Sequence, residues 1–263
     1  ELLSGCDGLF HTATIYSTQG NAQEILDTAN KGTLHLFHAA SAAKVPRIIY
    51  TSSTAAVGTE PKGKVKDESM WQTDTNLPYT TAKTQAEHLA WELAENLKLD
   101  VRVINPTAVL GGGFIRPTPS VDFFQDAMKG AFPVAPKFPM AAVHVRDVAR
   151  AHRRAFEVDE AEGRFILAPH ANLTLSMICR KIRELYPDSK SPKLALPNIL
   201  LPVAVFQDWV GGLFGKQRYL TRAVVKSLKK GDTNYSSEKA ERVLGMKWEG
   251  FDTCIKDTVD AYR

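Results

Sequence analysis

Cysteine is scarce in this sequence. The 263 residues include three cysteines, Cys6, Cys179 and Cys254, which lie far apart. Neither the paired ligand spacing of a zinc site nor the dense framework of a small secreted domain is present. We therefore expect no disulfide bond and no metal centre, and a reducing, cytoplasmic compartment suits the chain.

Long uninterrupted apolar runs are also lacking, and no secretory signal opens the sequence. A membrane-spanning helix needs about 20 predominantly apolar residues. The most apolar region, residues 194–214, is interrupted at four positions, Pro197, Asn198, Pro202 and Asp208. We expect no membrane partner and predict that this region forms a buried or pocket-lining helix.

No large excess of one charge is present, because 33 lysines and arginines face 29 aspartates and glutamates. One dense basic run, "RYLTRAVVKSLKKGD", separates at helical spacing into a basic face and an apolar stripe of Leu220, Val224 and Leu228. Cations in the last turn before Gly231 suit the C-terminus of a helix. The run predicts a solvated helix face, and we expect no nucleic-acid partner.

The glycine-rich turn that opens a dinucleotide-binding sheet is missing. Such a sheet begins with a strand, a G-x-G-x-x-G turn and a helix whose N-terminus holds a pyrophosphate. "LGGGF" at residues 110–114 is rich in glycine but follows a later strand, and we interpret it as a loop. Since the sequence enters a strand soon after Glu1, we expect the first βαβ segment to be absent from this chain.

Short apolar runs that alternate with longer amphipathic segments are clearly present. Strands are expected at residues 8–13, 47–53, 100–106 and 163–168, and helices at 21–44, 79–97, 122–129 and 174–185. This alternation predicts an α/β protein with a Rossmann-like, doubly wound parallel sheet. We expect residues 1–162 to form an incomplete dinucleotide-binding domain, with 111–137 contributing to a smaller lobe, and 163–263 to form mainly that substrate-binding lobe.

A tyrosine and a lysine stand four residues apart directly after Pro78. Tyr79 and Lys83 therefore share one face of a helix. A free tyrosine has a pKa of ~10, and a nearby ammonium group lowers it by favouring the phenolate. A shift to about 7 requires about 4 kcal/mol, which demands a sheltered pocket and a second cation such as an oxidised nicotinamide. On its own the pair also fits an ordinary surface contact.

The order of the surrounding segments is more specific than the pair alone. Upstream, "RIIYTSSTAAVG" is a strand that runs into the hydroxyl cluster of residues 51–54, where the carboxyl edge of a sheet borders a crevice. Downstream, "VRVINPT" is a strand that ends at Pro106 and Thr107.

With these segments the sequence resembles the extended short-chain dehydrogenase/reductase family over nearly its whole length. The matching segments are "GLFHTAT", "NKGTLHLFHAA", "YTSSTAAVG", "YTTAK", "NPT" and "VHVRDVARAH". "KDESMWQTD" at residues 66–74 resembles a loop of dihydroflavonol-4-reductase-like enzymes, and "NPTAVLGGGFIRPTPS" is similar both to those and to NAD-dependent sugar epimerase-like proteins. The resemblance implies a nicotinamide cofactor, with NADP(H) favoured and NAD(H) open.

The resemblance also implies residue roles. Tyr79 would protonate a substrate carbonyl, Lys83 would bind the nicotinamide ribose, and Ser53 would hydrogen-bond the same carbonyl, with Ser52 or Thr54 as alternatives. Besides Tyr79 and Lys83, the residues expected to contact the cofactor are Thr12, Ala13, Thr14, Pro106 and, if one residue is deleted in its loop, Ser120.

Several other residues receive a structural interpretation. His11 and His144 are expected to be packed or bonded to backbone, and Asp147 to cap a helix. Asn30 is assigned a structural role in its helix. Four side chains are expected to wall a substrate pocket or to belong to the core: Met70, Trp71, Phe114 and Phe123.

Three functions follow from this sequence. The first is a reductase that transfers hydride to an aldehyde or ketone of a small molecule; a flavonoid substrate is disfavoured because "TSSTAAVG" lacks the asparagine of the flavonoid enzymes. The alternatives are an NAD-dependent nucleotide-sugar epimerase or dehydratase, and a non-catalytic scaffold or redox sensor. The resemblance further implies a homodimer that pairs through the helices containing Asn30 and Tyr79.

Overall fold

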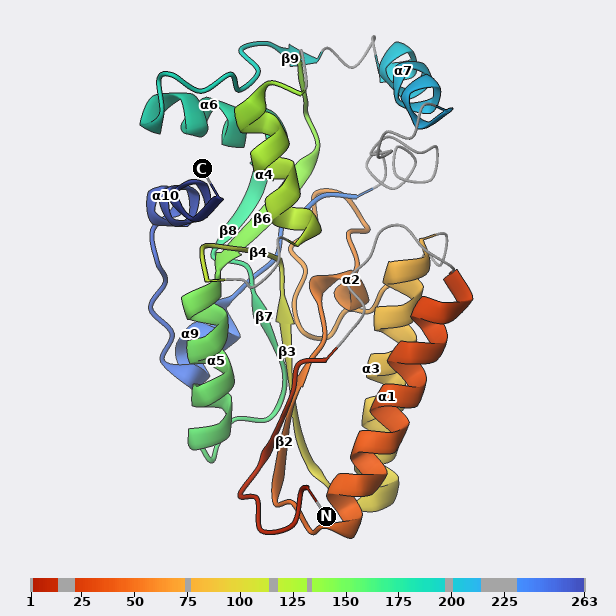
Figure 1. Cartoon of the computed structure of the whole chain (residues 1–263). Helices are drawn as coiled ribbons and strands as arrows, with labels where there is room; N and C mark the ends of the chain where they lie inside the picture. The colour runs from red at the N-terminus through yellow and green to blue at the C-terminus, as the bar shows by residue number, and fades with distance from the viewer. Residues whose placement is uncertain are drawn as a thin grey trace.

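A parallel sheet with helices on both faces organises the larger part of the molecule (Figure 1). The computed structural model describes residues 2–13, 22–73, 77–113, 118–131, 134–196, 201–213 and 231–262. The strand order is β1-β2-β3-β7, and the strands are Leu9–His11 (β1), Arg47–Thr51 (β2), Asp100–Pro106 (β3) and Gly163–Leu167 (β7). All three pairings are parallel. The predicted α/β fold is confirmed.

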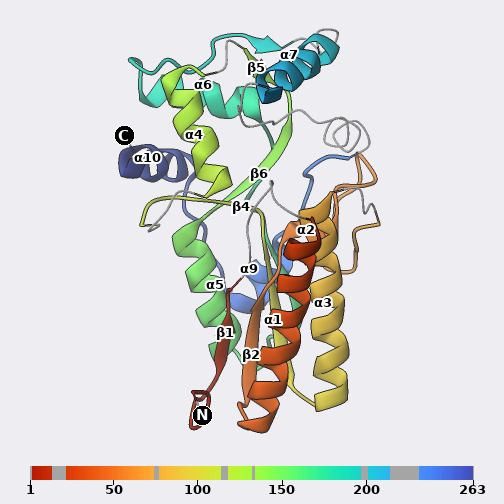
Figure 2. The same ribbon diagram turned by 45° about the vertical axis from the view of Figure 1, so that its right-hand side comes forward.

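The central strands are buried on both faces, as expected for a parallel sheet. On one face lie α1 (Ala22–Ala42) and α3 (Pro78–Leu97), side by side in both views (Figures 1 and 2). On the other face, α5 (Val145–Glu157) and α9 (Glu238–Leu244) pack against β2, β3 and β7. Four alanines at a spacing of four residues are buried along α3, and their small side chains let this helix pack closely against its neighbours: Ala82, Ala86, Ala90 and Ala94.

A second, smaller layer of structure lies beyond the carboxyl ends of these strands (Figure 1). It contains a three-stranded sheet of Ala108–Leu110 (β4), Pro139–His144 (β6) and His170–Thr174 (β8), and the short pair Ala135–Pro136 (β5) and Ala195–Leu196 (β9). Around it lie α4 (Pro119–Lys129), α6 (Leu175–Leu185) and α10 (Phe251–Tyr262). Strand β7 joins the large parallel sheet although it follows residue 162, so the chain returns to the first layer after β6.

The apolar region at residues 194–214 differs from its prediction. Helix α7 (Leu201–Leu213) exposes a row of large apolar side chains at helical spacing: Val203, Phe206, Trp209 and Leu213. Of the two alternatives, a buried or a pocket-lining helix, the buried one was therefore wrong for these residues, because apolar composition does not reveal whether a neighbouring element covers a helix. The pocket-lining alternative stays a prediction. The basic run at residues 218–230 lies outside the described residues. Among the described helices, none combines the length and the apolar character that a bilayer span requires.

Candidate active site

Tyr79 and Lys83 lie in the first two turns of α3, and Lys83 reaches the carboxyl end of β2. Pro78 is the first residue of the helix, where its missing N–H has no helical partner to lose. Tyr79 is half-buried, and Lys83 is only 4% exposed. The Lys83 ammonium donates to the carbonyl oxygen of Thr51, the last residue of β2, at 3.3 Å. The sheet edge and the helix face thus meet at this amine.

Burial sets the charge state of Lys83. Desolvation lowers the pKa of its ammonium to about 8, and the negative charge of Glu87, one helical turn further along α3, raises it in part. At neutral pH the group is therefore a cation that titrates within reach of physiological conditions. Such an amine can bind an anionic or hydroxyl-bearing ligand and can favour the ionised form of a neighbouring phenol.

The hydroxyl cluster after β2 divides into three different environments. Ser53 is the N-cap of α2 (Thr54–Val57), and its Oγ accepts from the backbone N–H of Ala55 at 3.1 Å. Ser52 is buried and donates to the Glu87 carboxylate. Thr54 donates to the carbonyl oxygen of Pro106 at 3.4 Å. Among the described residues, only Ser53 of these three has no acceptor assigned to its hydroxyl hydrogen.

Beneath the hydroxyls lies a buried polar cluster that sequence reasoning missed. Glu87 is fully buried and Arg164 of β7 is 6% exposed; Arg164 Nε lies 2.6 Å from Glu87 Oε1, although the two atoms are not aligned as in an ideal hydrogen bond. Asn105 of β3 donates from Nδ2 to Glu87 Oε2 at 2.8 Å and to the carbonyl oxygen of Ser53 at 3.1 Å. A signal for this cluster was present in the sequence. In "AEHLA" and "GRFIL" the charged residues Glu87 and Arg164 stand at positions that the periodicity predicts to be buried.

The loop at residues 66–74 is fastened to the edge strand β7. Glu68 Oε1 accepts from the backbone N–H of Ile166 at 3.1 Å. Trp71 lies between two side chains: its ring stacks on His88 at 3.9 Å between centroids, and the Arg164 guanidinium carbon lies 4.0 Å from its centroid. Of the two interpretations offered for Trp71, these contacts fit packing rather than a pocket wall.

The comparison with known proteins agrees with this arrangement. A sequence model of the NAD dependent epimerase/dehydratase family matches residues 1–168. The chain belongs to this family.

Several curated proteins that are similar to this chain are named reductases. Cinnamoyl-CoA reductase CAD2 from Medicago truncatula is 33% identical over 281 residues, covering 100% of this chain and 75% of that protein. Cinnamoyl-CoA reductase 2 from the same plant is 33% identical over 213 residues, covering 74% of this chain and 62% of that protein. The predicted likeness to dihydroflavonol-reductase-like enzymes is confirmed by a putative dihydroflavonol 4-reductase from Synechocystis among the matches.

The fold likewise extends to solved structures. The yeast methylglyoxal/isovaleraldehyde reductase Gre2, solved as a complex with NADPH, is 22% identical and superposes with a TM-score of 0.76 over 98% of this chain and 77% of that one. At this identity the likeness supports the fold alone. This chain spans between three fifths and four fifths of the length of these four proteins.

The residues expected to contact the family's cofactor gather at one edge of the parallel sheet. Thr12 and Ala13 follow β1 and are exposed, and Pro106 ends β3 and is buried. In open α/β sheets a nucleotide binds outside the carboxyl ends of the strands. Because the Lys83 cation also lies at this edge, the donor set fits a nicotinamide nucleotide. Thr14 lies outside the described residues, and Ser120 lies in the first turn of α4, where only the backbone is described.

The two histidines occupy the structural roles expected of them, with one difference each. His11 is buried with its ring 5.1 Å from that of Tyr50, and burial lowers its pKa, but neither ring nitrogen has a partner in the described part of the chain. His144 Nδ1 accepts from the backbone N–H of Arg146 at 3.1 Å. Its Nε2 lies 3.2 Å from the Asp257 carboxylate. The sequence did not predict this contact, because the two residues are far apart along the chain.

The assignment of Asp147 as a helix cap is corrected by this geometry. His144 is the N-cap of α5, and Asp147 is the third residue of the helix. The Asp147 carboxylate is fully buried, accepts from the backbone N–H of Glu249 at 2.9 Å and pairs with Arg150 at 3.1 Å. It therefore holds the segment that leads into α10, a partner too distant in sequence to be inferred from local spacing.

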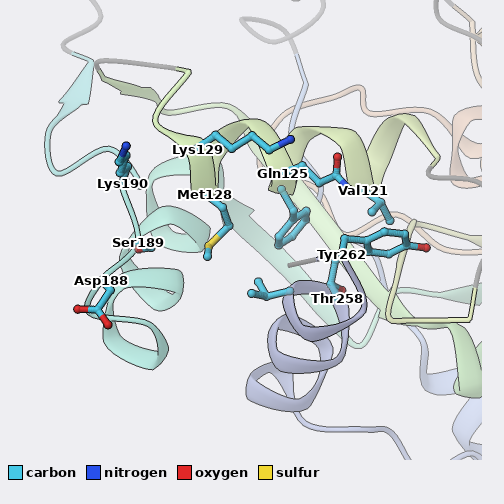
Figure 3. Close-up of a pocket in the computed structure, with 11 residues that line it drawn as sticks. Val121, Gln125, Met128, Lys129, Asp188, Ser189, Lys190, Thr258 and Tyr262 are labelled. Atoms are coloured by element: carbon cyan, nitrogen blue, oxygen red, sulfur yellow. The ribbon is translucent and has the colours of Figure 1, made fainter.

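Other expected residues lie away from the hydroxyl cluster. Asn30 on α1 donates to Gln85 on α3 at 3.5 Å, which fits its structural interpretation. Met70 packs against core residues around Ile166. Phe114 lies outside the described residues, and nothing is described of the Phe123 side chain. A cavity of about 370 Å³ between α4, the loop at 188–190 and α10 contains none of the site residues (Figure 3).

Proposed function

We propose that the protein is an NADPH-dependent reductase of a small aldehyde, ketone or thioester carbonyl. The observation that carries the proposal is the buried Lys83 ammonium on the helix face it shares with Tyr79, at the sheet edge where Ser53 presents its hydroxyl. The names of the relatives support reduction, and NADP(H) is the cofactor that the resemblance to such reductases favours over NAD(H).

Each residue has a distinct part in this reaction. The cofactor, when bound, supplies the hydride. Tyr79 donates a proton to the carbonyl oxygen, and Ser53 donates a hydrogen bond to the same oxygen. Lys83 binds the ribose hydroxyls and favours the phenolate that remains on Tyr79 after proton transfer. Thr12, Ala13, Thr14, Pro106 and Ser120 border the nucleotide.

The environments of the three hydroxyls support Ser53 over its neighbours. Ser52 already donates to a buried carboxylate and Thr54 to a backbone carbonyl, so neither can donate to a substrate without losing a partner. Ser53 accepts from Ala55 and retains its hydrogen for a ligand.

The first experiment removes the phenolic hydroxyl group of Tyr79. Tyr79→Phe is expected to lower turnover of a cinnamoyl-CoA thioester or a small ketoaldehyde by roughly 10² to 10⁴-fold, measured as consumption of NADPH. Binding of NADPH, measured by fluorescence, should change little. Ser52→Ala, Ser53→Ala and Thr54→Val compared in the same assay identify the hydroxyl, and the largest loss of kcat is expected for Ser53→Ala.

Two results would contradict the proposal. Unchanged turnover of Tyr79→Phe removes this residue from the mechanism. Tightly bound NAD after purification, together with isomerisation of a nucleotide sugar without net oxidation, assigns the site to an epimerase instead. A homodimer through α1 and α3 stays a prediction, which light scattering of the purified protein tests.

A further inference from the structure

We propose that Glu87 and Arg164 are positioning residues that act as one unit, holding the Ser53 peptide, the Lys83 amine and the loop at 66–74 in the arrangement that reduction requires. This inference rests on the proposed function. Neither residue contacts the place where substrate is expected, and both act through the groups they bind.

The position of Glu87 follows from helical geometry. Tyr79, Lys83 and Glu87 are spaced by four residues and therefore share one face of α3, so the carboxylate lies one turn below the amine. Glu87 is fully buried, at 0% exposure. A charge in such a place is tolerated only when it is paired and hydrogen-bonded.

The carboxylate connects to Ser53 through a single amide. Glu87 Oε2 accepts from Ser52 Oγ and from Asn105 Nδ2, and the same Asn105 Nδ2 donates to the carbonyl oxygen of Ser53. These hydrogen bonds hold the backbone on both sides of Ser53. The Ser53 side chain is held as well, because its Oγ caps α2.

Arg164 connects the other side of Glu87 to the loop. Its Nη1 donates to the carbonyl oxygens of Glu68 at 3.0 Å and Met70, and its guanidinium lies against Trp71, which in turn stacks on His88 of α3. One arginine therefore joins strand β7, the loop and the helix that carries Tyr79 and Lys83. Displacement of any of these elements moves the Arg164–Glu87 pair.

The pair also sets the field at Lys83. The titratable groups that act on this amine are His11 from β1 and Glu87 from its own helix, and Arg164 reaches Glu87 from β7. Only Glu87 supplies a negative charge among them, and it opposes the effect of burial on the pKa of Lys83. A well-packed apolar pair could replace a buried ion pair in stability, but it could not supply this charge.

The test compares three variants of the full chain. Glu87→Gln removes the charge, and the double variant Glu87→Gln with Arg164→Met removes the pair as a unit, so that no buried charge is left alone. Arg102→Met removes another buried arginine, which lies on the neighbouring strand β3 and points to the opposite face of the sheet, toward the end of α5, and serves as the matched control. The readouts are the thermal midpoint, kcat and KM, and the titration midpoint of Lys83 by NMR of labelled lysine without cofactor, assigned with Lys83→Arg.

The expected results separate positioning from stability. In Glu87→Gln the titration midpoint of Lys83 falls by about one pH unit, and it also falls in the double variant. Both variants lose about tenfold or more in kcat with a smaller change in KM. Arg102→Met lowers the thermal midpoint and leaves the Lys83 midpoint and kcat unchanged.

A folded double variant with the wild-type Lys83 midpoint and wild-type kcat would overturn the inference. Should that variant fail to fold, Ser52→Ala, which deletes one hydroxyl, carries the test, and a folded Ser52→Ala protein with wild-type kcat is then the overturning result. Because the Lys83 titration needs no turnover, an inactive wild-type protein would refute the proposed function while the titration still judges the pairing of Glu87 with Lys83.

Discussion

At the scale of single residues, the burial of an ammonium group is the dominant electrostatic feature of the site. Lys83 is 4% exposed, and its burial destabilises the charged form of the amine. Its pKa in the folded protein is about 8, against 10.5 for the exposed group. Between these two values the unfolded chain binds more protons than the folded one, so stability rises with pH through this window.

Lys83→Met is therefore expected to abolish activity and yet to stabilise the protein at neutral pH. The lowered pKa corresponds to about 3 kcal/mol of unfavourable free energy at pH 7, which the methionine avoids. Thermal or urea unfolding at pH 7 and pH 10 measures this, and the advantage of the variant should shrink at the higher pH. Lys31→Met, at an exposed position on α1, is the control and should show no such pH dependence. A variant less stable than wild type at pH 7 contradicts the idea.

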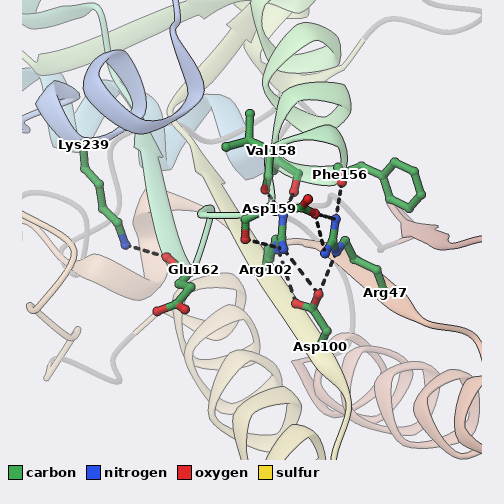
Figure 4. Close-up of polar contacts among 9 residues, drawn as sticks. Arg47, Asp100, Arg102, Phe156, Val158, Asp159, Glu162 and Lys239 are labelled. Atoms are coloured by element: carbon green, nitrogen blue, oxygen red, sulfur yellow. Dashed lines mark hydrogen bonds and ion pairs between the residues drawn. The ribbon is translucent and has the colours of Figure 1, made fainter.

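At the scale of elements, helix α5 ends on the side chains of two arginines from the sheet. The last carbonyl groups of a helix have no partner within it. Arg102 of β3 donates to the carbonyl oxygens of Ala155, Val158 and Asp159, and Arg47 of β2 donates to that of Phe156 at 2.5 Å (Figure 4). Asp100 lies between the two guanidinium groups, 2.7 Å from Arg47 and 3.3 Å from Arg102. The cations also complement the negative end of the helix dipole.

Arg102→Met is expected to lower the free energy of unfolding by roughly 2–4 kcal/mol, because it leaves several buried carbonyl groups without donors. Urea denaturation measures the loss. Arg153→Met, on the exposed side of the same helix, should leave the midpoint unchanged, because among the described residues Arg153 pairs only with Glu157. Equal effects of the two substitutions would show that capping by Arg102 contributes nothing.

The elements also show what could be predicted from the sequence. The sequence pattern placed α1, α3 and β3 within one or two residues of their observed ends, because the two helices are amphipathic and β3 is a short, mostly apolar run that is buried along its length. The dyad on α3 was visible because Tyr79 and Lys83 are close in sequence. The partners of Glu87 and the Glu249 partner of Asp147 could not be predicted, since they come from strands and loops that only the tertiary fold brings near.

At the scale of the whole molecule, the C-terminal segment returns to the first layer and closes over the loop after α2. Gly231 approaches so closely that a Cβ there would lie 2.3 Å from Thr59 Oγ1. Asp232 pairs with the fully buried Lys66 and accepts from the backbone N–H groups of Gly63 and Asn234. Desolvation raises the pKa of Asp232, but its hydrogen bonds lower it by more, so the net shift is downwards.

Asp232→Asn is expected to destabilise the protein at neutral pH, because the buried Lys66 ammonium loses its counter-ion. Since the pKa of Asp232 is lowered by folding, its stabilising contribution is present above about pH 4 and is lost as the pH falls through the folded value. The difference in thermal midpoint between wild type and variant should accordingly shrink in acid. A constant difference from pH 7 to pH 3 would assign the loss to packing instead.

The sequence position of Asn105 has a consequence for the chemical lifetime of the protein. Asparagine side chains age by deamidation, in which the backbone nitrogen of the next residue attacks the amide and closes a succinimide ring. Here the next residue is Pro106, whose nitrogen carries no hydrogen, so this ring cannot form in the usual way. Conversion to aspartate would have set a second carboxylate against Glu87, and the proline that ends β3 protects the centre of the molecule from that slow damage.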